Sequence, residues 1–376
     1  MRHRDGTRAR KILIYGQVPP PHHGSNIMTE FFIRALKKLG YEALLSPKNF
    51  SRTIGEVNKA TAIKPWRVFA AFSRFLKNLL NFKPGLVVFF TSSRKIGFLA
   101  DAPFVLAARI AGIPYVHYIH TQGPFRIYAG GGPGRILIKG LIGRASACLV
   151  LGKIFEEQIR AFYGGPIHVL PNCLEDSWNP AARTEDPEGT VNVIFLSNIQ
   201  RAKGIITLVQ AIPMVVAEHP RTRFIIAGPW QDEGLRDEVM DTVKVLDLEA
   251  NVDFPGPVYH EAKKNLFSRG DIFVLPSDYE AFAIVNLEAM RAGLPVITTA
   301  VGAMPDLILE GRSGFLIPPL RADLLAEKLN LLIADAPLRK AMGAEGRRLF
   351  EKRFSFSSYT HRLGEIMSEI IEKRTP

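Results

Sequence analysis

The sequence predicts an α/β protein built from two Rossmann-like, doubly wound domains. The first observation behind this prediction is length, because 376 residues exceed what one compact α/β domain usually needs. The second is that short β-branched or aromatic runs alternate with longer amphipathic segments along the whole chain, as parallel strands joined by helices do. The third is a stretch of linker composition at residues 177–190, after which the alternation starts again.

Each half of the chain contains six candidate strands. Those of the first half are residues 11–16, 41–46, 86–90, 115–119, 147–151 and 168–170. Those of the second half are residues 191–196, 224–227, 252–254, 272–275, 296–298 and 315–317. We expect an N-terminal domain at 1–180, a C-terminal domain at 181–354 and a last helix within 355–376. Ligands of open parallel sheets bind outside the carboxyl ends of the strands, so two such sheets facing each other leave a cleft.

Composition limits the cellular setting. Cys148 and Cys173 form no CxxC pair and have no neighbouring His cluster, so neither a disulfide framework nor a zinc site is indicated. The apolar run at residues 12–15 is too short for a signal peptide, and no stretch approaches the roughly 18 apolar residues of a membrane span. We expect a cytoplasmic protein that is at most peripheral on the inner face of a membrane.

Charge is unevenly distributed along the chain. The total is +12, but residues 1–180 carry 25 Lys and Arg against 9 Asp and Glu, whereas the remainder carries 23 against 27. A basic half joined to a near-neutral half indicates that one domain meets an anionic partner, such as a phospholipid surface, a pyrophosphate-linked acceptor or nucleic acid. A generally basic, solvated surface is the alternative interpretation.

The segment at residues 276–290 is the most informative motif. A strand ends at Leu275, the following loop carries Glu280, and a helix is predicted to begin near Ala281. Glu280 and Glu288 are then separated by about 12 Å of helical rise and about 80° of rotation. That is too far apart for two carboxylates flanking one glycosidic bond, which need roughly 5 to 9.5 Å. The spacing suits contacts to different parts of one elongated ligand. The alternative is a loop glutamate beside a solvated helix glutamate.

This segment, with its continuation through residues 293–296 and 311–315, resembles the Glu-x7-Glu signature of the group 1 (family 4) retaining glycosyltransferases of the GT-B fold. The resemblance implies that Glu288 holds the ribose hydroxyls of a nucleoside diphosphate sugar. It also implies that the last helix returns to the N-terminal domain. The remaining donor contacts that it implies are Glu280 and the amides of Ala281, Phe282 and Ala283, which would hold the sugar and phosphate oxygens.

A second resembling stretch is residues 195–204, the family's strand and loop carrying a basic pair for the donor pyrophosphate. Lys203 matches the family lysine, which implies that it stabilises charge developing on the leaving diphosphate. Where the family usually has Arg, this chain has Asn198. Arg201, two residues before Lys203, is the candidate replacement.

In the N-terminal half, two further positions are candidates. Gly24 closes a loop between the first strand and a helix, where it either lies against phosphate or relieves a tight turn. His120 follows the strand at residues 115–119 and resembles the family histidine near the transferred sugar, whereas His117 is interpreted as a hydrogen-bonded core residue.

Residues 64–83 form an amphipathic segment. If this segment is a helix, it has an apolar stripe on one side and basic residues on the other. This pattern is typical either of an interfacial membrane helix or of a helix that covers a sheet, and we favour the second interpretation. The stripe is Val68, Phe72, Phe75, Leu76 and Leu79, and the basic side is Arg67, Arg74 and Lys77. Residues 134–144 form a second basic and apolar stretch.

Together these features predict a retaining glycosyltransferase that moves a sugar from a nucleoside diphosphate sugar to an acceptor glycan or lipid-linked sugar, in polysaccharide or glycoconjugate synthesis. Peripheral contact with an anionic membrane is a further expectation. The family resemblance implies that no cofactor or metal is needed for the chemistry, and the sequence agrees with this expectation, since it has neither an Asp-x-Asp motif nor a spaced ligand cluster. An epimerase or phosphorylase on the same fold is the alternative. A nucleic-acid binder is disfavoured, since no module that reads nucleic acid is recognisable.

Overall fold

The structure, a computed structural model, describes residues 10–17, 24–48, 65–180 and 189–372. The chain folds into two compact units, unit 1 (Met1–Asn172 with Phe356–Pro376) and unit 2 (Cys173–Ser355). Most of the predicted loop at residues 16–24 and of the linker at 177–190 lies outside the described residues, as does residue 64.

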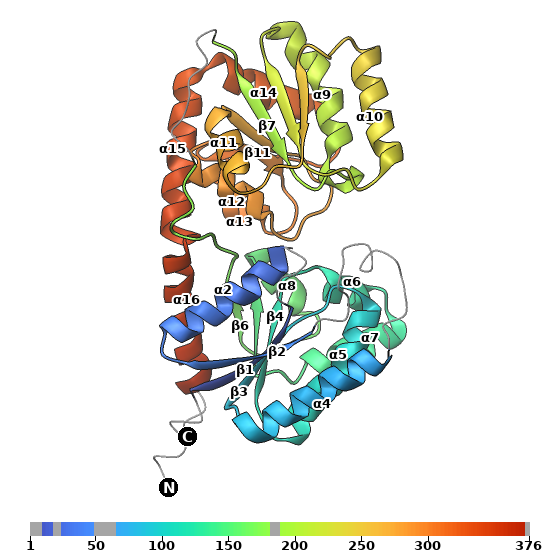
Figure 1. The fold of residues 1–376 in the computed structure, drawn as a ribbon, viewed down its shortest axis with the longest axis vertical. Helices are drawn as coiled ribbons and strands as arrows, with labels where there is room; N and C mark the ends of the chain where they lie inside the picture. Colours follow the sequence, from blue (N-terminus) through green and yellow to red (C-terminus); the bar gives the residue numbers. More distant parts are fainter. Residues whose placement is uncertain (1–9, 18–23, 49–64, 181–188, 373–376) are drawn as a thin grey trace. The chain divides into compact units, whose positions relative to one another are not determined.

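Unit 1 contains a six-stranded parallel sheet in the order β2-β1-β3-β4-β5-β6 (Figure 1). Every residue of the central strands β3 and β4 is buried, as expected for a parallel sheet covered on both faces. The six strands are β1 (Lys11–Gly16), β2 (Glu42–Pro47), β3 (Leu86–Phe90), β4 (Tyr115–Ile119), β5 (Ala147–Val150) and β6 (Ile167–Val169).

The helices of unit 1 form two groups around this sheet. The C-terminal helix α16 packs on α2, and the rings of Phe31 and Phe356 lie 5.6 Å apart. In the second group, α4 packs against α5, and α5 packs against α7. The helices are α2 (Gly24–Lys38), α4 (Pro65–Phe82), α5 (Lys95–Ile110), α6 (Gly123–Ala129), α7 (Gly132–Ile142), α8 (Lys153–Ile159) and α16 (Phe356–Glu372).

Unit 2 repeats this architecture with a sheet in the order β12-β11-β10-β7-β8-β9. Its strands are β7 (Asn192–Leu196), β8 (Arg223–Ala227), β9 (Val252–Gly256), β10 (Ile272–Leu275), β11 (Val296–Thr299) and β12 (Gly314–Ile317). Its helices are the 3₁₀ turn η1 (Arg201–Lys203), α9 (Ile205–Glu218), α10 (Glu233–Val245), α11 (His260–Arg269), α12 (Ile284–Arg291), α13 (Met304–Leu307), α14 (Ala322–Ala334) and α15 (Ala336–Arg353). The strand order reverses between β7 and β10, which makes their carboxyl ends the expected ligand-binding edge.

The fold class predicted from the sequence is confirmed, and each predicted strand appears within two residues of its expected bounds. Helix α4 covers β1 and β2, as favoured above, with Phe75 and Leu79 buried. The assignment of Leu76 to the same stripe is wrong. Its side chain is exposed, because it lies one residue, or about 100°, around the helix from Phe75.

Candidate functional site

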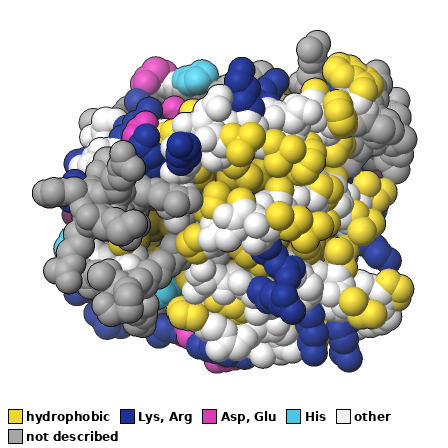
Figure 2. All heavy atoms as spheres, turned by 90° about the horizontal axis from the view of Figure 1, so that it is seen from below, with side chains coloured by type: hydrophobic (Ala, Val, Ile, Leu, Met, Phe, Trp, Pro, Cys, Tyr) yellow, Lys and Arg dark blue, Asp and Glu magenta, His cyan; other side chains and the backbone are white. Residues whose placement is uncertain are grey.

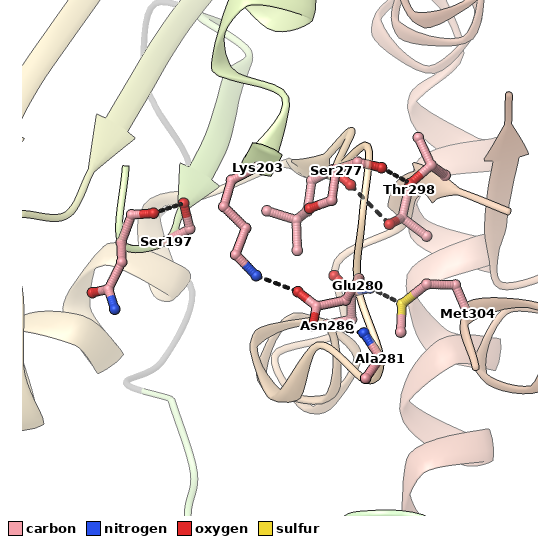
Figure 3. Close-up of polar contacts among 11 residues, drawn as sticks. Ser197, Lys203, Ser277, Glu280, Ala281, Asn286, Thr298 and Met304 are labelled. Atoms are coloured by element: carbon pink, nitrogen blue, oxygen red, sulfur yellow. Dashed lines mark hydrogen bonds and ion pairs between the residues drawn. The ribbon is translucent and has the colours of Figure 1, made fainter. Parts of the chain in front are cut away.

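Two loops at the carboxyl edge of the unit 2 sheet bring a cation and an anion together. Strands β7 and β10 are parallel neighbours, so the segments that follow them leave the sheet side by side. Lys203 ends η1 after β7, and Glu280 lies in the loop after β10. The Lys203 ammonium forms an ion pair with Glu280 Oε2 (Figure 3). The structure therefore places these two predicted site residues in direct contact.

A glycine allows the two loops to approach this closely. Gly204, directly after Lys203, has φ +78° and is the residue on which helix α9 starts. A Cβ at this position would lie 1.8 Å from the carbonyl oxygen of Pro276, at the end of β10. The amide of Asp278 also donates to the carbonyl of Ala202, at 3.0 Å. The backbones are thus in contact beneath the ion pair, which requires a residue without a side chain.

The loop carrying Glu280 is held from its other side. Gly302 has φ +55°, and a Cβ there would lie 2.1 Å from the carbonyl oxygen of Glu280. The amide of Ala303 donates to the carbonyl of Ala281, at 3.0 Å. Glu280 Oε1 accepts a hydrogen bond from the amide of Ala281, at 3.1 Å. With side-chain exposures of 14% for Glu280 and 24% for Lys203, the pair is partly desolvated and still accessible.

The predicted start of the following helix near Ala281 is wrong, because α12 begins at Ile284. Ala283 is extended, with φ −85° and ψ 103°, and both Phe282 and Ala283 are buried. The contact with residues 302–303 keeps this stretch out of the helix. Glu280 is consequently a loop residue, and the helical rise calculated between it and Glu288 does not apply.

Glu288 lies within α12 and is 6% exposed. Its Oε1 is 2.5 Å from the Nζ of Lys263 on α11. Burial raises the pKa of Glu288, and the Lys263 ammonium opposes this shift. The alternative interpretation of Glu288 as a solvated helix residue is therefore wrong. Lys263 is not identified from the sequence, since nothing in the α11 segment indicates which lysine faces α12.

Buried polar side chains lie to one side of the pair (Figure 3). Asn286 donates to the sulfur of Met304, at 3.0 Å, and the hydroxyls of Thr298 and Thr299 donate to the carbonyls of Leu275 and Ser277 (Figure 3). Within the described part of the chain, Asn286 Oδ1 and Ser277 Oγ are buried without a hydrogen-bond partner. Such atoms are uncommon in folded proteins, and they leave unused hydrogen-bonding capacity in the buried layer beside this edge of the sheet.

Asn198 and Arg201 lie away from the ion pair. The Arg201 guanidinium pairs with Glu238 on α10, and its side chain is 60% exposed. Asn198 is exposed, and its carbonyl accepts a hydrogen bond from Ser197 Oγ at 3.2 Å. The structure does not bring either side chain to Lys203 and Glu280.

The remaining candidates belong to unit 1. His120 follows β4, is 8% exposed, and its ring packs against the rings of both Phe90 and Tyr118. Burial lowers the pKa of His120 to about 3, with the side chain of Asn172 opposing the shift, so the imidazole is neutral at pH 7. His117 is a buried core residue, with its Nδ1 3.1 Å from the hydroxyl of Thr91.

Gly24 is the first residue of α2, and residues 18–23 before it lie outside the described chain. Among the described residues, no group of three or more His, Cys, Asp or Glu side chains is placed to hold a metal ion. None of the helices described there is both long enough and apolar enough to cross a membrane.

The match to a protein-family model lies in the unit that contains this site. Residues 177–349 match the model of a family described as glycosyl transferases group 1. The chain is 32% identical over 174 residues to the phosphatidylinositol N-acetylglucosaminyltransferase gpi3 subunit of Schizosaccharomyces pombe, covering 45% of this chain and 36% of that protein. It is 26% identical to the alpha-D-kanosaminyltransferase of Streptomyces kanamyceticus, covering 73% and 75%. Three of the curated relatives are matched over only 52%, 36% and 62% of their lengths.

A solved structure shares the fold. The Anabaena protein Alr3699/HepE, determined in complex with UDP, superposes with a TM-score of 0.75 at 18% identity, covering 96% of this chain and 100% of that one.

Proposed function

We propose that the protein transfers a sugar from a nucleoside diphosphate sugar to an acceptor, because residues 177–349 match the model of the group 1 glycosyl transferases. Lys203, Glu280 and Glu288 all lie within the matched residues. The observation that carries the proposal is the contact between Lys203 and Glu280 at the edge where the strand order of unit 2 reverses. A nucleotide is the ligand class that open α/β sheets bind at such an edge.

The ion pair has a direct role in this chemistry. When the bond between sugar and diphosphate breaks, negative charge develops on the leaving phosphate oxygens. A cation already held in place stabilises that charge without reorganising. Glu280 fixes the Lys203 ammonium, and its carboxylate is also an acceptor for sugar hydroxyls. The partial burial of both side chains strengthens these interactions relative to water.

Glu288 has a separate role in binding. Its carboxylate would accept hydrogen bonds from the ribose hydroxyls, as the family resemblance implies. Lys263 contacts one carboxylate oxygen and favours the ionised form, which is the better acceptor. Glu288 would thus contribute mainly to nucleotide affinity, and the Lys203–Glu280 pair mainly to turnover.

Finer features of the reaction rest on resemblance. We propose retention of the anomeric configuration because members of the resembling family retain it. We propose a lipid-linked or otherwise anionic glycan precursor as acceptor because residues 1–180 are strongly basic. A UDP-sugar is the first donor class to test, since the HepE neighbour was solved with UDP and with UDP-glucose. No metal or cofactor is assigned to the transfer.

A thermal-shift panel of nucleoside diphosphate sugars tests the proposal. A ligand at about a hundred times its dissociation constant stabilises the folded protein by about 2.7 kcal/mol, so a true donor should raise the melting temperature. Incubating that donor without acceptor should release the nucleoside diphosphate slowly and leave the sugar configuration of the unreacted donor unchanged. Absence of a shift with every sugar nucleotide would remove the proposal. Conversion of the donor to an epimeric sugar nucleotide would replace it with an epimerase.

A further inference from the structure

One side of unit 1 exposes an unusual number of large apolar side chains. Of the ten exposed large apolar residues in the described part of unit 1, nine lie on α4, α5 and α7. Figure 2 shows hydrophobic side chains gathered into one broad area with Lys and Arg side chains beside it. Broad exposed apolar areas on a folded protein usually mark a surface that binds something.

Helix α5 supplies the centre of this area. Its exposed residues follow a helical period along one side, while Phe98, Phe104 and Val105 are buried on the other. A helix that is apolar on both sides is normally covered on both sides. The exposed residues and their fractional exposures are Ile96 (62%), Leu99 (51%), Leu106 (49%) and Ile110 (79%).

Helices α4 and α7 extend the area on either side of α5. On α4, Phe75 and Leu79 face the core, and a second apolar stripe points outward. Because α5 packs against both α4 and α7, the exposed stripes are neighbours, and we call them together the apolar face. Its members outside α5 are Trp66 (65%), Phe69 (73%), Leu76 (37%) and Leu80 (72%) on α4, and Ile136 (75%) on α7.

The charge around the apolar face has one sign. Between Pro65 and Ser146 the chain carries 11 Lys and Arg residues and one acidic residue, Asp101. Asp101 is buried and forms an ion pair with Lys48, at 2.5 Å, so it does not reduce the positive charge outside. The exposed basic side chains on α4 and α7 include Arg74, Lys77, Arg135 and Lys139.

A hollow of about 680 Å³ lies at the C-terminal end of α5. It is lined by apolar side chains of the face, Leu106 and Ile110, and by Arg109 and Arg144. Arg109 donates to the carbonyl of Gly140, at 3.1 Å, which holds it against α7 and leaves further N–H donors. Apolar walls with two guanidinium groups suit a phosphate group attached to an acyl chain.

We propose that the α4–α5–α7 face of unit 1 docks on an anionic phospholipid leaflet, with its apolar side chains in the interface and its basic side chains on lipid phosphates. Apolar helix sides flanked by Lys and Arg are the pattern of interfacial membrane helices. A second copy of this chain fits less well, because a two-fold contact would place two positive surfaces against each other. The inference does not depend on the proposed sugar transfer.

Vesicle co-sedimentation of the full chain tests the proposal, with phosphatidylcholine vesicles alone and mixed with phosphatidylglycerol. Wild type should pellet with the mixed vesicles and dissociate as salt rises from about 0.1 M to about 1 M, where the Debye length falls from about 10 Å to about 3 Å. The double variant Arg74→Gln, Lys139→Gln should partition into the mixed vesicles about 25-fold more weakly than wild type, because each basic residue near the surface contributes about fivefold. Leu99→Gln with Ile110→Gln should weaken it about tenfold or more.

Matched controls come from α10 in unit 2. The first control, Arg236→Gln with Lys244→Gln, removes two positive charges from α10. The second control, Met240→Gln with Val245→Gln, replaces two exposed apolar side chains of the same helix. Both controls should pellet like wild type. No pelleting with mixed vesicles, or equal losses in face and control variants, would overturn the proposal. The proposal would also be overturned if the protein self-associates without lipid and the Leu99→Gln, Ile110→Gln variant does not. A second copy of the chain would then cover the apolar face.

Nucleotide binding is measured on the same variants. A face variant that loses pelleting while a donor still raises its melting temperature remains folded and supports docking as a separate property. A wild-type protein that pellets as expected but binds no sugar nucleotide leaves the docking proposal standing and contradicts the proposed function.

Discussion

Lys203 and Glu280 are 77 positions apart in the sequence, yet the structure joins them in an ion pair. Both residues can be identified from the sequence, because each follows a predictable strand and each matches a family motif. Their contact cannot, since it depends on the backbone approach at Gly204. Lys263 also escapes sequence-based prediction, because its pairing with Glu288 arises from the packing of α11 against α12.

Lys203→Ala should lower turnover about 100- to 1,000-fold, as removal of one preorganised group facing developing charge commonly does. Arg201→Ala is the matched control, because Arg201 pairs with Glu238 at an exposed site and should leave turnover near wild type. Steady-state release of the nucleoside diphosphate gives the comparison. An equal loss in both variants would assign Arg201 to the diphosphate and contradict its placement here.

Glu288→Ala should weaken nucleoside diphosphate binding about tenfold to a hundredfold, the effect of losing a charge-assisted hydrogen bond. Burial raises the pKa of Glu288, so this carboxylate takes up a proton at a higher pH than an ordinary glutamate does. As the pH is lowered, the affinity of the wild type for the nucleoside diphosphate should therefore begin to fall at that higher pH. Lys263→Met should move that loss to still higher pH, since the ammonium lowers the pKa. Calorimetric titrations across pH measure both effects. Affinity of Glu288→Ala equal to wild type would exclude Glu288 from the nucleotide site.

His120 is predicted to act as a neutral imidazole. The pKa of His120 is lowered from 6.5, its ordinary value, to about 3 in the folded state, so the folded protein disfavours the protonated ring. The stability that this ring contributes is fully present above pH 6.5 and is lost as the pH falls toward 3. Between pH 7 and pH 5 this costs about 2 kcal/mol of unfolding free energy. His120→Gln should remove that part of the pH dependence in urea unfolding. If the unfolding free energies of variant and wild type depend on pH in the same way, the burial of the His120 ring is contradicted.

Among the elements, the strands are the predictable part. They are short apolar runs bounded by turn residues, and burial on both faces makes that signal continuous. The start of α12 is not predictable, because residues 281–283 contain no capping residue and are held by a contact with residues 302–303. The outward apolar stripe of α5 is not predictable either, since a helix that is apolar on both sides has no polar side to mark its orientation.

Gly204→Ala should destabilise unit 2 and separate Lys203 from Glu280. A left-handed conformation costs a non-glycine residue roughly 1–2 kcal/mol, and here the added Cβ also meets the Pro276 carbonyl at 1.8 Å. Gly311→Ala is the matched control, because Gly311 has φ +69° with no atom within 4 Å of an added Cβ. The melting temperature should fall further for Gly204→Ala. Equal losses would show that the close backbone contact contributes nothing.

For the whole molecule, the fold class was predicted from the sequence and is confirmed, and residues 177–349 match the model of the family described as glycosyl transferases group 1. These are properties of pattern and motif spread over many residues. The concentration of positive charge in residues 1–180 could also be read from the sequence. That this charge lies beside exposed apolar helix sides could not, because the exposure of a helix side depends on which side the sheet covers.

A double-mutant cycle decides whether Lys203 and Glu280 act as one unit on the donor. Donor turnover is measured for wild type, Lys203→Ala, Glu280→Ala and the double variant. Groups that act together are strongly non-additive, so the double variant should lose little more than the worse single variant. Losses that simply multiply, or single variants with wild-type turnover, would exclude a joint role for the pair.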